Sequence, residues 1–161
     1  MIGLGSDHLG FGLKQRLGDF LAESGEAVHD FGTFSEQPVD YPDVAVSVAE
    51  ALRAGVIDRG ILVCGTGLGM AIAANKVPGI FAAPVADLET ARRARQSNNA
   101  QIITLGADIV STGLACAIVA AWLAAQFKGG DSARKVAKIR ALERRYHPEA
   151  APALLAEAVP C

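Results

Sequence analysis

The chain has 161 residues, of which 51% are hydrophobic and 20% are charged, and its formal net charge is −2 at pH 7. This length predicts a single domain with enough chain to bury a core, and the small negative charge argues against nucleic acid as the main partner. The three cysteines, Cys64, Cys116 and Cys161, are widely spaced without a CxxC pair, which favours a reducing cytoplasm over a disulfide framework or a zinc site. No export leader is visible, and the most apolar segment, 114–127, is too short to span a membrane.

Short apolar runs alternate with amphipathic segments along residues 1–146. Strands are predicted at 1–6, 27–31, 60–64, 80–85 and 101–105, and helices at 11–24, 43–54, from 69 to 75, 88–96, 112–127 and 132–146. This alternation predicts one domain with a parallel sheet, helices on both faces and the strand order 2-1-3-4-5. Residues 147–161 hold three prolines and many alanines, and we expect a C-terminal tail or an arm that packs on a partner.

Polar residues follow the first and third predicted strands. In a parallel α/β sheet, ligands bind beyond the carboxyl ends of the strands, at the point where the strand order reverses. Those two ends carry Ser6-Asp7-His8 and Cys64-Gly65-Thr66-Gly67. The fold rule therefore places a binding site where the chemically capable residues lie.

The stretch after the third strand, CGTGLG, is rich in glycine. Gly65, Gly67 and Gly69 permit close backbone approach, and the helix that follows offers free N–H groups. The segment is neither a Walker A loop nor a GxGxxG motif. It is either an anion-binding loop or a tight strand-to-helix turn.

Cys64 lies at the edge of this loop, and two interpretations of it stay open. A thiolate beside a helix N-terminus is a competent base or nucleophile. A buried cysteine that simply ends a strand is equally compatible with its position. Cys116, within a helix, and Cys161, in the tail, are interpreted as unreactive.

Other candidates carry similar alternatives. Asp7 and His8 either bind sugar hydroxyls and an anion or cap the next helix. Tyr41 either lines a pocket or anchors its loop. The last helix carries a basic face on which Arg134 and Lys135 either reach a phosphate or are solvated, while Val136, Ile139 and Leu142 are expected to face inward. The three histidines have no metal-ligand spacing, so no metal is expected.

Five segments resemble the ribose-5-phosphate isomerase type B and galactose-6-phosphate isomerase family. They are GSDHLGFGLK, DYPDVAVSVAEAL, GILVCGTGLGMAIAANKVPGI, NNAQIITLGADIV and AAWLAAQFKGG, in order along the chain. The resemblance implies a Rossmann-like three-layer α/β/α sandwich with a five-stranded parallel sheet. It also implies a homodimer or tetramer whose sites are completed by the neighbouring chain, without a metal or organic cofactor.

The family interconverts aldose and ketose phosphates through a cis-enediol, and the resemblance assigns roles by position. Cys64 matches the proton-transfer residue, with the hydroxyl of Thr66 beside it. The position where one subfamily carries a glutamate is Met70 here. The remaining matches bind substrate: the amides of Gly65, Gly67, Leu68 and Gly69 take the enediolate oxygen, Asp7, Tyr41 and Asn98 take hydroxyls, His8 takes phosphate, and Lys135, with Arg134 beside it, stands in place of a phosphate ligand.

Three positions depart from the family pattern. Ser97 stands where a histidine opens the furanose ring, and Asp108 and Asp131 stand where arginines hold phosphate. Carboxylates there would repel a phosphate bound in the usual place. We therefore expect an isomerase of a small sugar phosphate, with a tetrose 4-phosphate such as erythrose or erythrulose 4-phosphate as a candidate substrate. The alternatives are an isomerase of free sugars and a non-catalytic sugar-binding subunit.

Overall fold

The structure, a computed structural model, describes residues 1–148, and the expected tail beyond Pro148 lies outside the described residues. Strands and helices alternate through the described chain, and a final helix follows the last strand–helix pair. The elements are β1 (Ile2–Ser6), α1 (Phe11–Glu23), β2 (Val28–Asp30), α2 (Tyr41–Arg53), β3 (Arg59–Cys64), α3 (Leu68–Ala74), β4 (Ala82–Pro84), α4 (Leu88–Gln96), β5 (Ile102–Gly106), α5 (Thr112–Leu123) and α6 (Asp131–Tyr146). No helix among these residues is long and apolar enough to cross a membrane.

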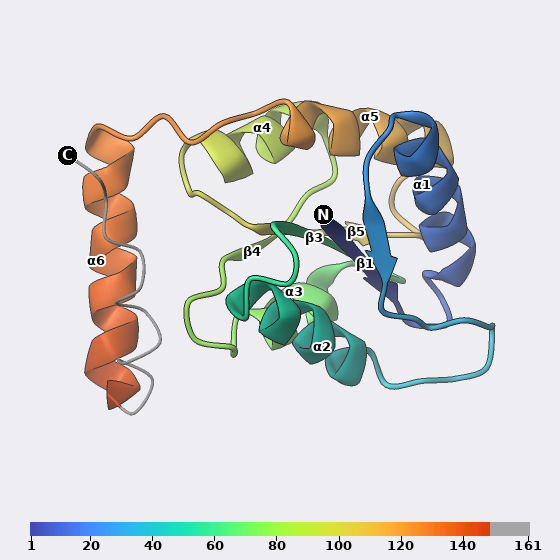
Figure 1. Cartoon of the computed structure of the whole chain (residues 1–161), viewed down its shortest axis with the longest axis horizontal. Helices are drawn as coiled ribbons and strands as arrows, with labels where there is room; N and C mark the ends of the chain where they lie inside the picture. The colour runs from blue at the N-terminus through green and yellow to red at the C-terminus, as the bar shows by residue number, and fades with distance from the viewer. Residues whose placement is uncertain (149–161) are drawn as a thin grey trace.

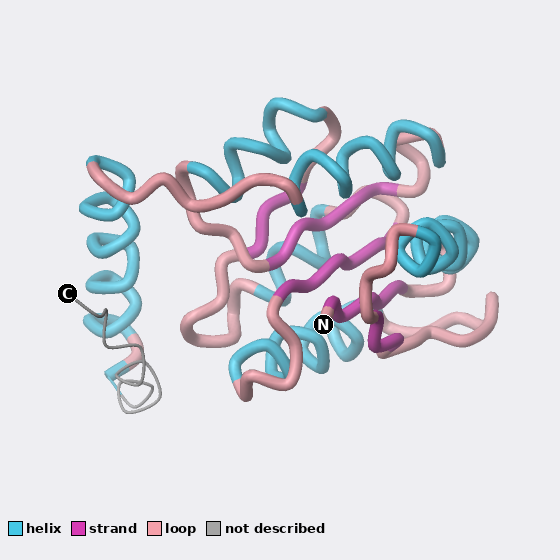
Figure 2. The backbone as a smooth tube through the Cα atoms, turned by 45° about the horizontal axis from the view of Figure 1, so that its top comes forward, coloured by secondary structure: helices cyan, strands magenta, loops and turns pink. Residues whose placement is uncertain are grey.

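The five strands form one parallel sheet in the order β2-β1-β3-β5-β4, so the predicted order 2-1-3-4-5 is wrong at its last two places (Figure 2). β5 is buried along its whole length and lies beside β3, whereas β4 is a short edge strand. β4 ends in Pro84, whose missing N–H suits an edge strand that needs no second partner. The sequence expectation of a three-layer α/β/α sandwich is otherwise confirmed.

The direction of travel across the sheet explains which helix covers which face. The chain steps one way from β1 to β2, the other way from β2 to β3 and β4, and back one place to β5. Because such crossovers are right-handed, α1 and α4 lie on one face and α2 and α3 on the other (Figure 1). α5 joins the α1 face, where it packs against both α1 and α4.

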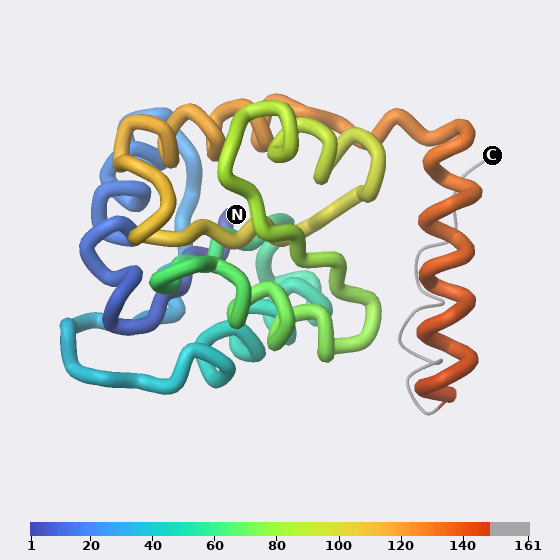
Figure 3. The backbone as a smooth tube through the Cα atoms, turned by 180° about the vertical axis from the view of Figure 1, so that it is seen from behind, coloured from blue at the N-terminus to red at the C-terminus, as the bar shows by residue number. Residues whose placement is uncertain are grey.

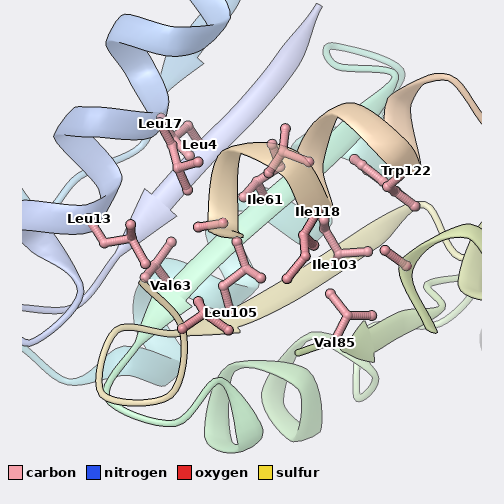
Figure 4. Close-up of a cluster of buried hydrophobic side chains, with 14 of the residues drawn as sticks. Leu4, Leu13, Leu17, Ile61, Val63, Val85, Ile103, Leu105, Ile118 and Trp122 are labelled. Atoms are coloured by element: carbon pink, nitrogen blue, oxygen red, sulfur yellow. The ribbon is translucent and has the colours of Figure 1, made fainter. Parts of the chain in front are cut away.

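Alternate residues of the central strands supply the two cores. Ile61 and Val63 point to the α1 face, where they pack with Leu17 and Trp122 (Figure 4). Leu62 and Cys64 belong to the cluster under α2 and α3. The alternation therefore directs the thiol of Cys64 to the side of the sheet that the following glycine-rich turn and α3 cover.

Helix α6 stands apart from the sandwich, as Figures 1 and 3 show from opposite sides. The carboxylate of Glu143 accepts hydrogen bonds from the N–H of Gly79 at 2.9 and 3.0 Å, just before β4 begins. Val136 is the one residue of α6 that is buried. Ile139 and Leu142 are 43% and 53% exposed, so the expectation that they face inward is wrong. Part of the apolar side of α6 therefore stays exposed within one chain.

Candidate active site

The carboxyl ends of β1 and β3 meet, and they bring Asp7 next to Cys64. The two strands pair in register, with Ser6 opposite Val63. The N–H of Asp7 donates to the carbonyl oxygen of Val63 at 3.2 Å. Asp7 is 4% exposed and Cys64 is 5% exposed. The predicted juxtaposition of the two strand ends is therefore present.

The segment Gly65–Gly69, here named the glycine loop, contacts the sulfur of Cys64. The N–H of Gly67 donates to Sγ at 3.1 Å, and the hydroxyl of Thr104 on β5 donates to the Gly67 carbonyl at 2.7 Å. Gly67 has a φ of 79°, and a Cβ there would lie 3.0 Å from the carbonyl carbon of Leu105. Glycine is needed at this position, because a side chain would meet both backbone strain and the β5 main chain.

Tyr41 covers the far end of the glycine loop. It is the first residue of α2, and a Cβ added at Gly69 would lie 2.7 Å from two of its ring carbons. The phenol ring therefore lies directly on Gly69 and closes one side of the loop. Thr66 and Leu68, between the glycines, are exposed, and the Thr66 hydroxyl accepts a 3.4 Å hydrogen bond from the Leu68 N–H.

Asp7 and His8 make local hydrogen bonds as well as lining the strand ends. One oxygen of Asp7 accepts from the N–H of Gly10 at 2.9 Å and so supports the turn before α1. The Nδ1 atom of His8 accepts from the N–H of Val39 at 3.3 Å. A neutral imidazole whose Nδ1 accepts carries its proton on Nε2, which can then donate to an anion.

A carboxylate stands beside the same loop. Asp108, in the turn after β5, has its Oδ2 3.0 Å from the place where a Gly65 Cβ would be, and its N–H donates to the Gly65 carbonyl at 3.0 Å. Its side chain is exposed. The loop therefore has a negative charge on this flank, opposite in sign to an anion-binding group.

A hollow of about 370 Å³ opens next to the glycine loop. Its walls come from Thr66 and Leu68 of the loop, from the segment after β4 and from Ile109. Leu68 and Ile109 are 56% and 58% exposed. The exposed side of the glycine loop therefore faces an apolar hollow, which neither Cys64 nor Tyr41 lines.

The remaining predicted site residues lie elsewhere. Asn98 follows α4, which runs back toward the amino ends of the strands, and it lines a second cavity of about 330 Å³ with Phe81 and Ile139. Arg134 and Lys135 are exposed on α6, which contacts the chain at Gly79 before β4. Within one chain, Asn98, Arg134 and Lys135 therefore lie toward the amino ends of the strands, whereas Cys64 lies at their carboxyl ends.

Two supporting residues were missed from the sequence. Thr104 is fully buried and holds the glycine loop, and Lys14 is 1% exposed within α1. Each had a signal, since Thr104 is a hydroxyl in an otherwise apolar strand and Lys14 is a charge between two inward leucines. Residues 1–148 hold no cluster of three or more histidine, cysteine or acidic side chains that would bind a metal. Burial in α5 raises the pKa of the Cys116 thiol.

The profile of the Ribose/Galactose Isomerase family matches residues 2–139. The chain belongs to this family. It is 49% identical over 140 residues to D-erythrulose-4-phosphate isomerase of Pectobacterium atrosepticum, an alignment that covers 86% of this chain and 91% of the relative. It is 44% identical over 144 residues to ribose-5-phosphate isomerase B of Escherichia coli, covering 89% and 97% of the two chains.

Solved structures of the family agree with the fold. The structure of ribose-5-phosphate isomerase B of Clostridium thermocellum is 51% identical, with a TM-score of 0.89 over 90% of this chain and 98% of that one. The family assignment made from the five sequence segments is confirmed, and so is the expected α/β architecture.

Proposed function

We propose that this chain is an aldose–ketose isomerase of a small sugar phosphate and that Cys64 moves the proton. The observation that carries the proposal is the contact between the sulfur and the glycine loop, whose Gly67 N–H is directed at Sγ at 3.1 Å. The named activities of relatives at 44% and 49% identity support the same reaction type. A strand-terminal cysteine with only a packing role would not need a main-chain N–H directed at its sulfur.

The reaction needs a base and a place for developing negative charge. The Cys64 thiolate takes the proton from C2 of the open-chain aldose, and the electron pair moves through a C1–C2 double bond to the carbonyl oxygen. In the resulting cis-enediolate the 2-hydroxyl proton passes to O1, which becomes a hydroxyl, and the negative charge moves to O2. The same sulfur then returns its proton to C1 as the C2–O2 carbonyl forms, which gives the ketose. The glycine-loop amides other than that of Gly67, which donates to the sulfur, serve the enediolate oxygen together with the Thr66 hydroxyl.

The charges around the loop orient the substrate. Asp7 and Tyr41 offer an acceptor and a phenol to sugar hydroxyls, while His8 offers its Nε2 proton to the anionic end. Asp108 lies on the Gly65 flank, where it would repel a phosphate. The substrate therefore binds with its phosphate on the His8 side and its hydroxyls toward Asp108.

A second copy of the chain completes the site in this proposal. α4 and α6 place three of the expected site residues toward the amino ends of the strands: Asn98, Arg134 and Lys135. Cys64 lies at the carboxyl ends, so these residues do not reach Cys64 of their own chain. The exposed Leu68 and Ile109 at one edge and Ile139 and Leu142 at the other give apolar surface to an association. A homodimer would bring the basic start of α6 to the partner's phosphate.

Four carbons suit these residues better than five. A tetrose 4-phosphate cannot close a furanose ring because its 4-hydroxyl is esterified, so it needs no ring-opening base. Ser97, at the end of α4, stands where the family resemblance implies a ring-opening histidine. A serine hydroxyl is a poor base near neutral pH. Erythrose 4-phosphate and erythrulose 4-phosphate are therefore the proposed pair.

A steady-state panel tests this proposal. It compares tetrose 4-phosphates, ribose 5-phosphate, hexose 6-phosphates and the corresponding free sugars, each with wild type and Cys64→Ser. Cys64-dependent turnover of a sugar phosphate supports the proposal. Turnover confined to free sugars would instead favour the second candidate, an unphosphorylated substrate, which Asp108 and Asp131 would explain. If no sugar is turned over, both isomerase proposals are overturned and a non-catalytic sugar-binding subunit is the remaining explanation.

A further inference from the structure

A lysine is buried behind the site, and the reaction does not use it. Lys14 of α1 is 1% exposed, and its ammonium nitrogen lies 2.6 Å from each carboxylate oxygen of Asp30 at the end of β2. The ring of Phe34 lies across the same nitrogen, with its centroid 5.1 Å away. Burying an ammonium is costly unless it is paired, so a lysine held in this way has a structural or functional reason.

The pair is tied to the loop that follows β2. This β2–α2 loop, residues 31–40, leaves the carboxyl edge of the sheet and returns at Tyr41. Oδ1 of Asp30 also accepts from the N–H of Gly32 at 2.8 Å. The Phe34 ring folds back over Gly32, since a Cβ there would lie 3.4 Å from a ring carbon. Lys14, Asp30 and Phe34 therefore hold the first residues of the loop against α1.

The held residues connect directly to the site. The N–H of Ser6 donates to the Gly32 carbonyl and the N–H of Thr33 donates to the Ser6 carbonyl, both at 2.7 Å. Ser6 immediately precedes Asp7 and His8. The far part of the loop supplies the Val39 N–H that His8 accepts, and between them residues 34–38 are exposed. The orientation of the imidazole thus depends on a loop with few contacts of its own.

We propose that the Lys14–Asp30 pair is a positioning device that fixes the base of the β2–α2 loop and so sets His8 against the anionic end of the substrate. Neither residue touches the reacting atoms. The role of His8 in this statement rests on the proposed function, whereas the fixing of the loop does not. The pair would act on substrate binding and leave proton transfer at Cys64 nearly unchanged.

Lys14→Met is the primary variant. It replaces the buried ammonium with an apolar chain of similar length, and the remaining Asp30 carboxylate is 42% exposed and can be solvated. Lys14→Met/Asp30→Asn serves as the second variant, because it also removes the unpaired carboxylate while an amide oxygen can still accept from Gly32. Arg59→Met is the matched control. Arg59 is a half-buried cation that donates to the carbonyl oxygens of Trp122 and Leu123, away from the loop.

Hydrogen exchange tests the fixing of the loop without any substrate. In Lys14→Met and in the double variant, the amides of Gly32, Thr33 and Val39 should exchange about tenfold faster than in wild type. Such a loss of protection is typical of local opening. The amide of Leu62 in β3 should be unchanged, and Arg59→Met should leave the loop amides as in wild type. Unchanged protection of the three loop amides in both Lys14 variants would overturn the proposal.

Kinetics then test the link to His8. Lys14→Met should raise KM for the sugar phosphate about tenfold and change kcat by no more than about threefold. Combined with His8→Asn, it should add little further loss, because both changes act through one contact. A fall in kcat as large as the rise in KM, or additive effects of the Lys14 and His8 substitutions, would show a general structural role and overturn the positioning role. If wild type turns over no sugar phosphate, the proposed function fails while the exchange experiment still decides whether the pair fixes the loop.

Discussion

The sulfur of Cys64 and the main-chain N–H of Gly67 lie 3.1 Å apart, with the N–H directed at the sulfur. Cys64 ends the central strand β3, and Gly67 is the residue at which the chain turns into α3. The contact therefore couples the direction of a side chain to the shape of the loop. In the proposed reaction the same loop holds the enediolate oxygen, so base and oxyanion site are set by one piece of backbone.

Cys64→Ser should abolish isomerisation while the protein stays folded. A serine hydroxyl fits the same space but is not a base near neutral pH, so turnover should fall by about 10²- to 10⁴-fold. The decisive measurement is incorporation of deuterium from D₂O at the sugar α-carbon, followed by NMR together with steady-state rates. Cys116→Ser is the matched control and should retain wild-type activity, because Cys116 is in α5 away from the loop. Wild-type exchange in Cys64→Ser would rule out the assigned role.

Gly67→Ala should destabilise the protein as well as slow it. The positive φ costs a non-glycine residue about 1–2 kcal/mol, and the added Cβ would also press on the main chain at Leu105. Urea denaturation measures the loss of unfolding free energy. Gly12→Ala provides the control, since Gly12 is an exposed residue of α1 with nothing within 4 Å of an added Cβ. That change should stabilise the fold by about 0.5–1 kcal/mol, and equal effects of the two substitutions would refute the argument.

Most of the fold can be predicted from the sequence, but the order of the last two strands cannot. Five alternating pairs predict a parallel sheet, yet right-handed crossovers are satisfied by both 2-1-3-4-5 and 2-1-3-5-4. The discriminating features are the short length of β4 and its Pro84, which indicate an edge. The end of α5 at Leu123, four residues before the predicted end at 127, likewise depends on contacts with the last turn: Arg59 donates to carbonyl oxygens there.

The candidate site divides into a part that sequence reasoning reached and a part that it did not. Asp7 and Cys64 meet because the carboxyl ends of adjacent parallel strands share an edge, which the pattern alone predicts. The family resemblance groups Asn98 and Lys135 with them, whereas within one chain both lie toward the amino ends of the strands. Family position carries no information on which chain of an assembly supplies a residue. Lys14 was missed because its partner Asp30 is distant in sequence.

Two inactive variants should restore activity to each other if the site is shared between chains. Cys64→Ser removes the base, and Lys135→Glu reverses a charge proposed to reach the partner's phosphate. In a mixed dimer one site keeps an intact Cys64 and an intact Lys135, so mixing should give more activity than either variant alone. Mixing Cys64→Ser with Cys64→Ala is the control and should stay inactive. Light scattering should also report a particle of at least twice the 16.7 kDa chain, and a monomer would contradict the shared site.

Ser97→His should shift the substrate preference toward pentoses. Ring opening needs a group that takes the anomeric proton and returns it to the ring oxygen, and imidazole has a suitable pKa whereas a serine hydroxyl does not. A furanose-forming ribose 5-phosphate reacts with wild type only through its small open-chain population, while a tetrose 4-phosphate avoids that step. Wild type should therefore have the higher kcat/KM for erythrose 4-phosphate.

The variant should raise kcat/KM for ribose 5-phosphate by about tenfold or more, since general acid–base groups contribute factors of about 10²–10⁴ where they are well placed. Its kcat/KM for erythrose 4-phosphate should stay nearly constant, because no ring is opened. Ser97→Asn, which adds a polar side chain without a titratable group, is the control and should change neither. Because Ser97 ends α4 beside Asn98, the introduced imidazole would serve the site of the partner chain, so the gain should appear only in the dimer. Efficient wild-type turnover of ribose 5-phosphate, with tetrose phosphates inert, would overturn the assignment of a four-carbon substrate.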